Sequence, residues 1–331
     1  MNPRWKQFLR LAAHTQMLPV LESGEEETLV GGQAVMEGVM MRAPHSFCTA
    51  VRKPDGSIVT EEGPLAKVSE KYPFFRFVFL RGVGILGQAM VLGVKALRFS
   101  ANVAVEAEQG DLPEKDRKQI PAWALALNLA FSLAFFIFLY KFVPLWLTNL
   151  LKAQYPAMEG RIAFNFVDGV IRILIFLVFL TLLSRFKDIH RVFEFHGAEH
   201  RVVFNFESGQ PVTVENAQRF PTFHPRCGTS FLLVVMVVSM LLYMLLPFDS
   251  FLGRFLSRVA LLPVVTGVSY EMIRFAAKKR GSLLATLCAP GLWLQRITTQ
   301  PPAVDQTEVA IRALDGAMEL ERKQGGQLVI A

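Results

Sequence analysis

Cysteine is scarce in this sequence. Its 331 residues include three cysteines, Cys48, Cys227 and Cys288, which lie far apart. This number and spacing exclude the disulfide framework of a small secreted domain, so we expect a reducing environment that faces the cytoplasm. The first residues also lack the long apolar core and the small-residue cleavage site of a signal peptide, and we expect no cleaved leader.

Charged residues are scarce as well. They make up 19% of the chain, against 52% for hydrophobic residues, and phenylalanine outnumbers tyrosine by 28 to 5. Soluble domains carry about 25% charged residues, so this composition is typical of a polytopic membrane protein. The net charge of +7 comes mainly from residues beside apolar stretches, which indicates contact with a lipid bilayer and no specific DNA binding.

Long apolar stretches predict the membrane-spanning helices. Four of them have the length of about 20 residues that a bilayer requires: 122–147, 163–184, 229–248 and 255–276. Lysine and arginine are concentrated in the amino-terminal part, in residues 185–227 and in residues 278–280, and are few in the other connections. By the positive-inside rule, we expect both termini and residues 185–227 to face the cytoplasm.

A further apolar stretch, residues 77–101, is interrupted by charge. Only 13 residues separate Arg81 from Lys95, which is too few to cross a bilayer. A span here would also place the basic amino terminus on the outside. We therefore expect this stretch to be an interfacial or re-entrant helix.

A turn signal precedes this stretch. Pro54, Asp55 and Gly56 separate two strand-like runs, FCTAVRK and SIVTEE. Proline presets φ and glycine accepts a positive φ, as a tight turn requires. We therefore expect a small cytoplasmic unit that contains a β-hairpin, within a mainly α-helical polytopic membrane protein.

These patterns divide the chain into seven segments. A variable amino-terminal segment comes first, followed by the β-containing unit and then by the interfacial or re-entrant helix with its linker. Two transmembrane hairpins come next, separated by a cytoplasmic island rich in histidine and cysteine, and an interfacial segment with an amphipathic helix ends the chain. In chain order, the bounds are 1–29, 30–72, 73–121, 122–184, 185–228, 229–276 and 277–331.

The island contains a candidate metal site. Four of the six histidines lie in it, and His196, Glu199 and His200 form an H-x-x-E-H sequence. On a helix these three side chains share one face, so both imidazoles can reach one ion with the carboxylate beside them. The spacing is similar to that of the inverzincin metallopeptidases, in which two histidines bind Zn²⁺ and the glutamate is the general base. Gly197 departs from a good helix sequence, because glycine lowers helix propensity.

His224 and Cys227 offer a further imidazole and a thiolate, and Glu271 is an acidic alternative for the third ligand. Nitrogen and sulfur donors suit Zn²⁺, or another divalent transition metal, better than Mg²⁺ or Ca²⁺. Four protein ligands would make a closed structural site, and three would leave a position for catalysis with Glu199 as the base. The alternative is that the histidines contact lipid phosphates or each other, with Cys227 as a small buried hydrophobic residue.

A pair of opposite charges lies inside the second apolar stretch. Asp168 and Arg172 stand four residues apart and would share a helix face. Charges within a membrane are costly and commonly functional, so transport is one interpretation. We favour a self-neutralised pair that holds helices together, because the apolar stretches lack the Gly/Pro-broken centre of a typical transporter.

Five sequence blocks connect these features to a known family. They are GGQAVMEGVMMR (31–42), FHGAEHRV (195–202), TVENA (213–217), HPRCGTSF (224–231) and PGLWLQRITT (290–299). In these blocks the chain resembles the YqhQ-like bacterial membrane proteins, a family defined by a domain of unknown function and predicted to contain metal-dependent enzymes. The resemblance covers about residues 30–315. It implies a multi-pass protein of the bacterial inner membrane with a metal site, and it implies no substrate.

Two functions of different classes fit these observations. The first is a membrane-embedded, metal-dependent hydrolase whose site lies on the cytoplasmic face. The second is a non-enzymatic membrane factor or scaffold, in which the same residues are structural and the basic cytoplasmic face docks a protein partner such as the ribosome. An open coordination position at the metal would favour the first, and a closed one would favour the second.

Overall fold

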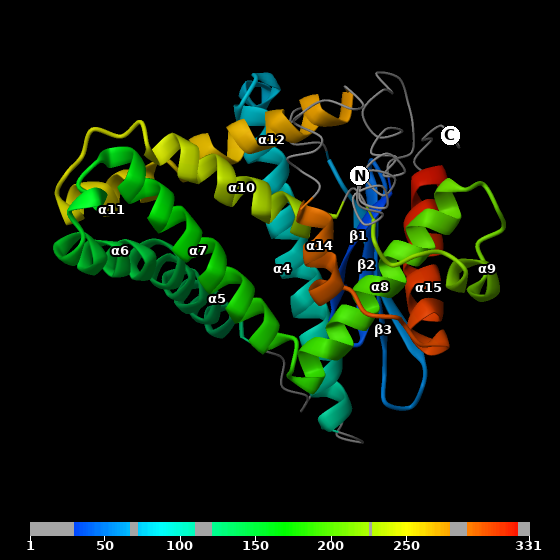
Figure 1. The fold of residues 1–331 in the computed structure, drawn as a ribbon. Coiled ribbons are helices and arrows are strands. Elements are labelled where there is room, and N and C mark those ends of the chain that lie inside the picture. Colours follow the sequence, from blue (N-terminus) through cyan, green and yellow to red (C-terminus); the bar gives the residue numbers. More distant parts are fainter. Residues whose placement is uncertain (1–29, 67–71, 110–120, 225–226, 279–289, 324–331) are drawn as a thin grey trace, which may run out of the picture.

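The computed structural model describes residues 30–66, 72–109, 121–224, 227–278 and 290–323 (Figure 1). The expected segment 1–29, Cys288 and the basic residues 279–280 lie outside the described residues. A four-stranded sheet comes first, and helices follow it. The strands are β1 (Gly31–Val35), β2 (Gly38–Arg42), β3 (Ser46–Arg52) and β4 (Ile58–Pro64). The helices are η1 (Pro73–Arg76), α4 (Leu80–Glu108), α5 (Ala122–Ile137), η3 (Phe138–Phe142), α6 (Val143–Gln154), η4 (Pro156–Met158), α7 (Arg161–Leu183), α8 (Lys187–Glu207), α9 (Val214–Gln218), α10 (Gly228–Tyr243), α11 (Phe251–Ala260), α12 (Leu262–Lys278), α14 (Pro290–Thr298) and α15 (Val304–Lys323).

The sheet is an antiparallel meander in the order β1-β2-β3-β4. The predicted hairpin is confirmed: Gly56 has a φ of +87°, and the backbone of Lys53 pairs with that of Ser57 across the turn. The Asp55 carboxylate accepts the Ser57 amide at 2.8 Å, which fixes the turn. Sequence reasoning missed the first hairpin, where Val35 pairs with Gly38.

Helices cover both faces of this sheet. Met41 and Cys48 point to one face and pack against α8 and α15. Their chain neighbours Met40 and Phe47 point to the other face and pack against Leu92 and Ala96 of α4, as the two-residue period of a strand requires. The β-containing unit, the histidine-rich island and the carboxy-terminal amphipathic helix therefore form one body.

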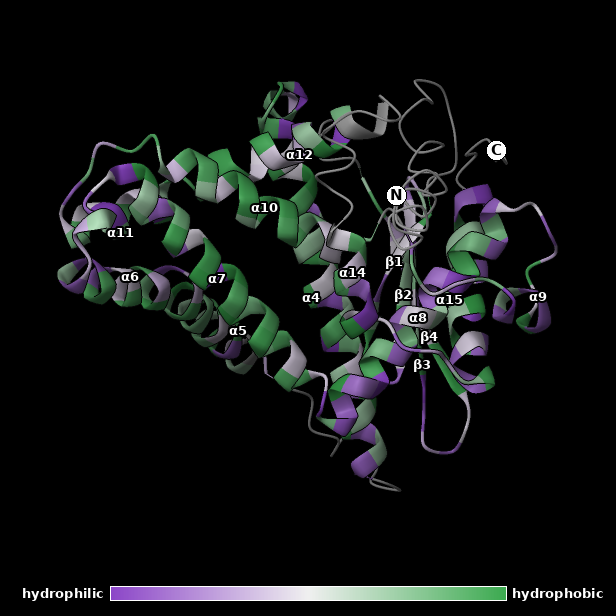
Figure 2. Ribbon diagram, in the orientation of Figure 1, coloured by the Kyte–Doolittle hydropathy of each residue, from purple (hydrophilic) through white to green (hydrophobic). Residues whose placement is uncertain are grey.

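The remaining helices form an apolar arm that extends from this body, in which α5, α7 and α10 are hydrophobic over most of their surfaces (Figure 2). By length and composition, three helical stretches in the described residues could cross a membrane: 80–108, 126–154 and 161–183. The count becomes four if α11 and α12, which are bent by 52° at their junction, form one broken span. The second and third stretches match two of the predicted spans.

The other predictions along the chain are changed by this geometry. The predicted span 229–248 corresponds to α10, which has only 16 residues. The predicted span 255–276 is broken at the junction of α11 and α12. For residues 77–101 the sequence predicts an interfacial or re-entrant helix. Helix α4 runs for 29 residues without a reversal, which excludes the re-entrant alternative, and its length and composition would also allow it to cross a membrane.

Candidate metal centre

Helix α8 carries the H-x-x-E-H sequence, as predicted. Its buried face includes Phe195, Ala198 and Val202, which pack into the core between the sheet and α15. This packing fixes the rotation of α8, and it leaves His196 and His200 together one turn apart. Their ring centroids lie 4.5 Å apart in an edge-to-face arrangement.

Gly197, which lowers the helix propensity of α8, has a packing role. The chain after α14 crosses the helix at this residue, and the Gln300 amide donates to the Phe193 carbonyl at 2.9 Å. A Cβ atom at position 197 would collide with the backbone oxygen of Gln300. The loss of helix propensity is therefore offset by a close approach that only glycine allows.

Cys227 joins the two histidines from the end of the island. It is the residue before α10, and its Sγ lies 3.2 Å from His196 Nε2. One donor atom from each of His196, His200 and Cys227 lies within 4.8 Å of the other two. Two imidazoles and a thiol at this separation can bind one tetrahedral transition-metal ion.

Backbone carbonyl groups orient both imidazoles. His196 Nδ1 lies 2.7 Å from the carbonyl oxygen of Thr298, and His200 Nδ1 forms a short contact with that of Thr222. A carbonyl oxygen only accepts, so each Nδ1 carries the ring proton and each Nε2 keeps its lone pair. This is the support that metal-binding histidines have in proteins.

Burial favours the neutral form of His200. The side chain is almost fully enclosed, and desolvation lowers its pKa, although the hydrogen bond with Cys227 acts in the opposite direction. A metal ligand must be a neutral imidazole. Burial therefore favours the form of His200 that a metal ligand requires.

Glu199 lies beside this cluster. It is 6% exposed, and its Oε2 is 3.5 Å from His200 Nε2. On the other side Gly32 of β1 gives it room, because a Cβ there would be 2.7 Å from Glu199 Cγ. The half-buried guanidinium of Arg42, at the end of β2, interacts electrostatically with Glu199. Sequence reasoning did not select Arg42 or Gly32, although both lie in the block GGQAVMEGVMMR.

His224 is near the cluster but is not part of it. Its ring is 5.5 Å from that of His200, and its Nε2 is 3.5 Å from Glu207 Oε2. Gln295 of α14 holds the backbone of His224 by two hydrogen bonds, at 2.8 Å and 2.7 Å. Burial lowers the pKa of His224 to about 4. The complete shell of four protein ligands is therefore not assembled, and Glu207, which sequence reasoning missed, is the neighbour of His224.

Glu271 does not reach the cluster. Its carboxylate forms a bidentate ion pair with Arg81 of α4, with Oε1 at 2.6 Å from Nε. The structure therefore does not bring Glu271, the predicted alternative for the third ligand, together with His196, His200 and Cys227. The pair instead joins α12 to α4. This contact was not predictable from local sequence patterns, because 190 residues separate Arg81 from Glu271.

The predicted pair of Asp168 and Arg172 is present, and it belongs to a larger network. Arg172 contacts one carboxylate oxygen of Asp168, and Arg258 of α11 donates to the other at 2.7 Å. Arg258 also donates to Asn165 at 2.8 Å, and Arg172 to Ser239 of α10 at 2.8 Å. The carboxylate thus links α7 to α11, and Arg172 links α7 to α10.

An aromatic ring completes this network. The guanidinium carbons of Arg172 and Arg258 lie 5.0 Å and 5.1 Å from the ring centroid of Tyr243, a cation–π distance. Lys141 donates to the Tyr243 hydroxyl at 2.8 Å, and it comes from η3, a π-helical turn. Sequence reasoning missed five members of this network, namely Lys141, Asn165, Ser239, Tyr243 and Arg258. The positive charge of Arg258 inside a predicted span was the signal that could have found it.

Comparisons with known proteins agree with the family resemblance. Residues 77–320 match a family described as "Protein of unknown function (DUF1385)". The chain is also 36% identical over 302 residues to a Bacillus subtilis (strain 168) protein named "Uncharacterized protein YqhQ", and this match covers 88% of the chain and 92% of the relative. No solved structure matches the chain.

Proposed function

The chain belongs to the DUF1385 family, and we propose that it is a membrane-embedded, zinc-dependent hydrolase with its site on the cytoplasmic face. The observation that carries this proposal is the convergence of His196, His200 and Cys227 on one point. Two imidazoles and one thiolate leave the fourth position of a tetrahedral ion open, as in catalytic zinc sites. The carboxylate of Glu199 lies next to that point.

The donor set fits Zn²⁺ and the surroundings fit hydrolysis. When bound, Zn²⁺ supplies Lewis acidity toward a water molecule and toward the polar oxygen of a substrate. The Glu199 carboxylate is placed to take the proton of the attacking water, as a general base must be. The Arg42 guanidinium, which interacts electrostatically with Glu199, would offer positive charge for an oxyanion. His224, held neutral by burial, adds no competing charge.

Packing between distant segments supports a cytoplasmic site and an even number of spans. In the sequence, the sheet comes before the helices of the apolar arm, α8 lies between the two halves of the arm, and α15 comes after it. The sheet, α8 and α15 nevertheless pack into one core. The chain must therefore return to the same side after α7 and again after α12. The two predicted hairpins, 122–184 and 229–276, would satisfy this condition if the 16-residue apolar helix α10 is one span and α11 with α12 is one broken span.

Helix α4 stays outside the bilayer in this arrangement. It has the length of a span. However, Leu92, Ala96 and Val103 of α4 cover one face of the sheet, and an open sheet cannot enter the hydrocarbon of a bilayer. The positive-inside rule then places this side in the bacterial cytoplasm. Labelling with a membrane-impermeant maleimide tests this topology: cysteines introduced for Lys152 and Asp249 should react from outside, and one introduced for Ser208 should react only after lysis. The reverse pattern contradicts it.

The zinc content of the purified protein tests the proposed function. We expect one Zn²⁺ per chain, lost in His196→Ala and in His200→Ala. Glu199→Gln should keep the ion, because a general base does not hold it. His190→Ala, on the same helix but outside the cluster, is the matched control and should also keep it. Full zinc in both cluster variants, or none in the wild type, contradicts the proposal and leaves the non-enzymatic scaffold.

A further inference from the structure

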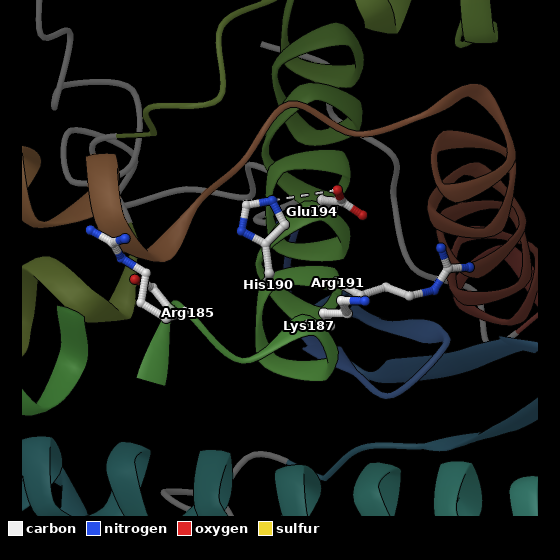
Figure 3. A pocket seen from close by; sticks show the side chains of 6 residues that line it. Arg185, Lys187, His190, Arg191 and Glu194 are labelled. Atoms are coloured by element: carbon white, nitrogen blue, oxygen red, sulfur yellow. Dashed lines mark ion pairs between the residues drawn. The ribbon is translucent and has the colours of Figure 1, made fainter. Parts of the chain in front are cut away.

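A pocket of 440 Å³ lies where α7 ends and α8 begins (Figure 3). It is separate from the three metal-ligating residues and carries mostly basic side chains. Its lining consists of Ser184, Arg185, Lys187, His190, Arg191 and Glu194. Its volume is within the range of small-molecule sites.

Two of the charged side chains in the pocket already have partners. Arg191 extends away from the pocket to the Glu37 carboxylate, with Nη2 at 2.7 Å from Oε2. Glu194 faces His190 from the next turn of α8, at 3.7 Å, and accepts a hydrogen bond from Gln306 at 2.8 Å. These contacts satisfy Arg191 and Glu194 within the protein.

Arg185 and Lys187 supply the unmatched charge. Both side chains are exposed, and neither forms an ion pair within the part of the chain that the structure describes. They lie on either side of Phe186: Arg185 is in the turn that follows α7, and Lys187 is the first residue of α8. Two unpaired cations beside a hollow of this size favour an anionic ligand.

An apolar stripe leads from α7 into this turn. Leu174, Val178, Leu182 and Phe186 follow one another at intervals of four residues, and each is more than half exposed. Leu174, Val178 and Leu182 share one face of α7, because residues four apart lie on one face of a helix. Phe186 follows in the turn after α7, so the stripe runs along α7 and ends beside the pocket. A ligand that fits both parts has an anionic head and long apolar chains.

We propose that this pocket binds the phosphate headgroup of an anionic phospholipid, whose acyl chains lie along Leu174, Val178 and Leu182. The inference rests on the membrane insertion of α7 in the proposed function. Basic pockets at the cytoplasmic ends of membrane helices recognise such headgroups. The lipid would anchor the first turn of α8, and it would thereby set the height of the metal-ligating residues above the bilayer.

Lipid-dependent thermal stability of the purified full-length protein in detergent tests this inference. The wild type is titrated with phosphatidylglycerol, phosphatidylcholine or inorganic phosphate. We expect only phosphatidylglycerol to raise the Tm. Arg185→Gln with Lys187→Gln should weaken the apparent affinity for it roughly thirtyfold, from about a fivefold loss for each juxtamembrane cation. Inorganic phosphate that reproduces the full shift would assign the pocket to a soluble anion and overturn the lipid.

A matched variant controls for net charge. Lys152→Gln with Arg161→Gln removes two cations at the opposite end of the apolar arm, and it should bind phosphatidylglycerol like the wild type. Equal affinities of all three proteins would overturn the proposed site. Zinc content is measured on the same preparations: a pocket variant that loses lipid affinity but keeps zinc separates this inference from the proposed function, which fails only if the wild type lacks zinc.

Discussion

Two buried polar clusters lie in different parts of this protein, and their hydrogen bonds differ. In the apolar arm, the carboxylate of Asp168 is shared by Arg172 and Arg258, and its two oxygens are both in use. In the body formed by the sheet, α8 and α15, His196 and His200 use one ring nitrogen each for a backbone carbonyl. Their second nitrogens face each other and Cys227, where an ion would satisfy all three groups.

The difference separates a structural cluster from a site. The arm cluster joins α7, α10 and α11 through contacts between its own members. Its charged residues therefore have a structural role that needs no ligand. The cluster in the body brings together the lone pairs of two imidazole nitrogens and one sulfur. These lone pairs repel one another unless a metal ion or a proton lies between them. This comparison supports the structural interpretation of Asp168 and the metal interpretation of His196.

The largest effect on stability is expected from Asp168→Asn. It leaves Arg172 and Arg258 buried without a carboxylate, and breaking such a group costs about 3–5 kcal/mol. Thermal or denaturant unfolding of the purified protein measures this loss, and Arg258→Met in the same chain should recover part of it. Asp249→Asn is the control: its partner is Arg254 at 3.2 Å, but its side chain is 79% exposed, so we expect less than about 1 kcal/mol.

Transport by the arm cluster makes the opposite prediction. In that case Asp168→Asn would fold with an unchanged free energy of unfolding, while ion or solute flux through reconstituted vesicles would be abolished. That pair of results would remove the contrast between the two clusters.

A smaller effect is expected from Gly197→Ala. The added methyl group meets the backbone of Gln300, and overpacking of this kind costs about 1–3 kcal/mol. Because the same chain segment carries Thr298, which orients His196, zinc affinity should also fall by about 10-fold to 100-fold. Competition with a chelator measures the affinity. Gly87→Ala in α4, where a Cβ meets nothing within 4 Å, should leave zinc binding unchanged; equal losses in both variants would show that the crossing does not position the histidine.

The smallest effect is expected in the reactivity of two thiols, those of Cys48 and Cys227, toward maleimide. Burial, followed by the nearby Glu62 carboxylate, raises the pKa of Cys48 to about 12, so its thiol should not react with maleimide at pH 8 in the folded protein. Cys227 should react only after zinc is removed, because the ion protects it. The experiment uses Cys288→Ser protein and mass spectrometry. Labelling of Cys227 at an equal rate with and without zinc would exclude it as a ligand.

The Cys48 thiol also gives a pH dependence with a defined sign. Its pKa is near 9 in the unfolded chain and about 12 in the folded one, so the unfolded state loses its proton first as the pH rises. The free energy of unfolding should therefore fall between pH 9 and pH 12. Cys48→Ala should remove this part of the decline.

Local patterns in the sequence predicted the elements well. The turn at Gly56, the helix that carries His196 and His200, and the amphipathic helix α15 each depend on residues close together in the chain. Periodicity and turn chemistry report such features directly. The convergence of Cys227 on the histidines was also predictable. A polar segment that connects two membrane-spanning helices begins and ends on the same side of the membrane, so its two ends can meet there.

Contacts between distant segments were not predictable in this way. The charges within residues 77–101 predict an interfacial or re-entrant helix, and the packing of α4 against the sheet follows only from the fold. Glu271 was a reasonable ligand until Arg81, 190 residues away, was found beside it. Likewise, nothing in the local sequence separates His224 from His200; the hydrogen bonds of Gln295 to the His224 backbone do so in the structure.

In the proposed function, two imidazoles and one thiolate hold a zinc ion with one position open. X-ray absorption at the zinc edge of the purified wild-type protein measures this directly. We predict one sulfur and two imidazole neighbours, together with one light atom that a small anion such as cyanide displaces. A third imidazole that disappears in His224→Ala, with no exchangeable neighbour, would show that the site is closed and structural. That result would contradict the proposed hydrolase.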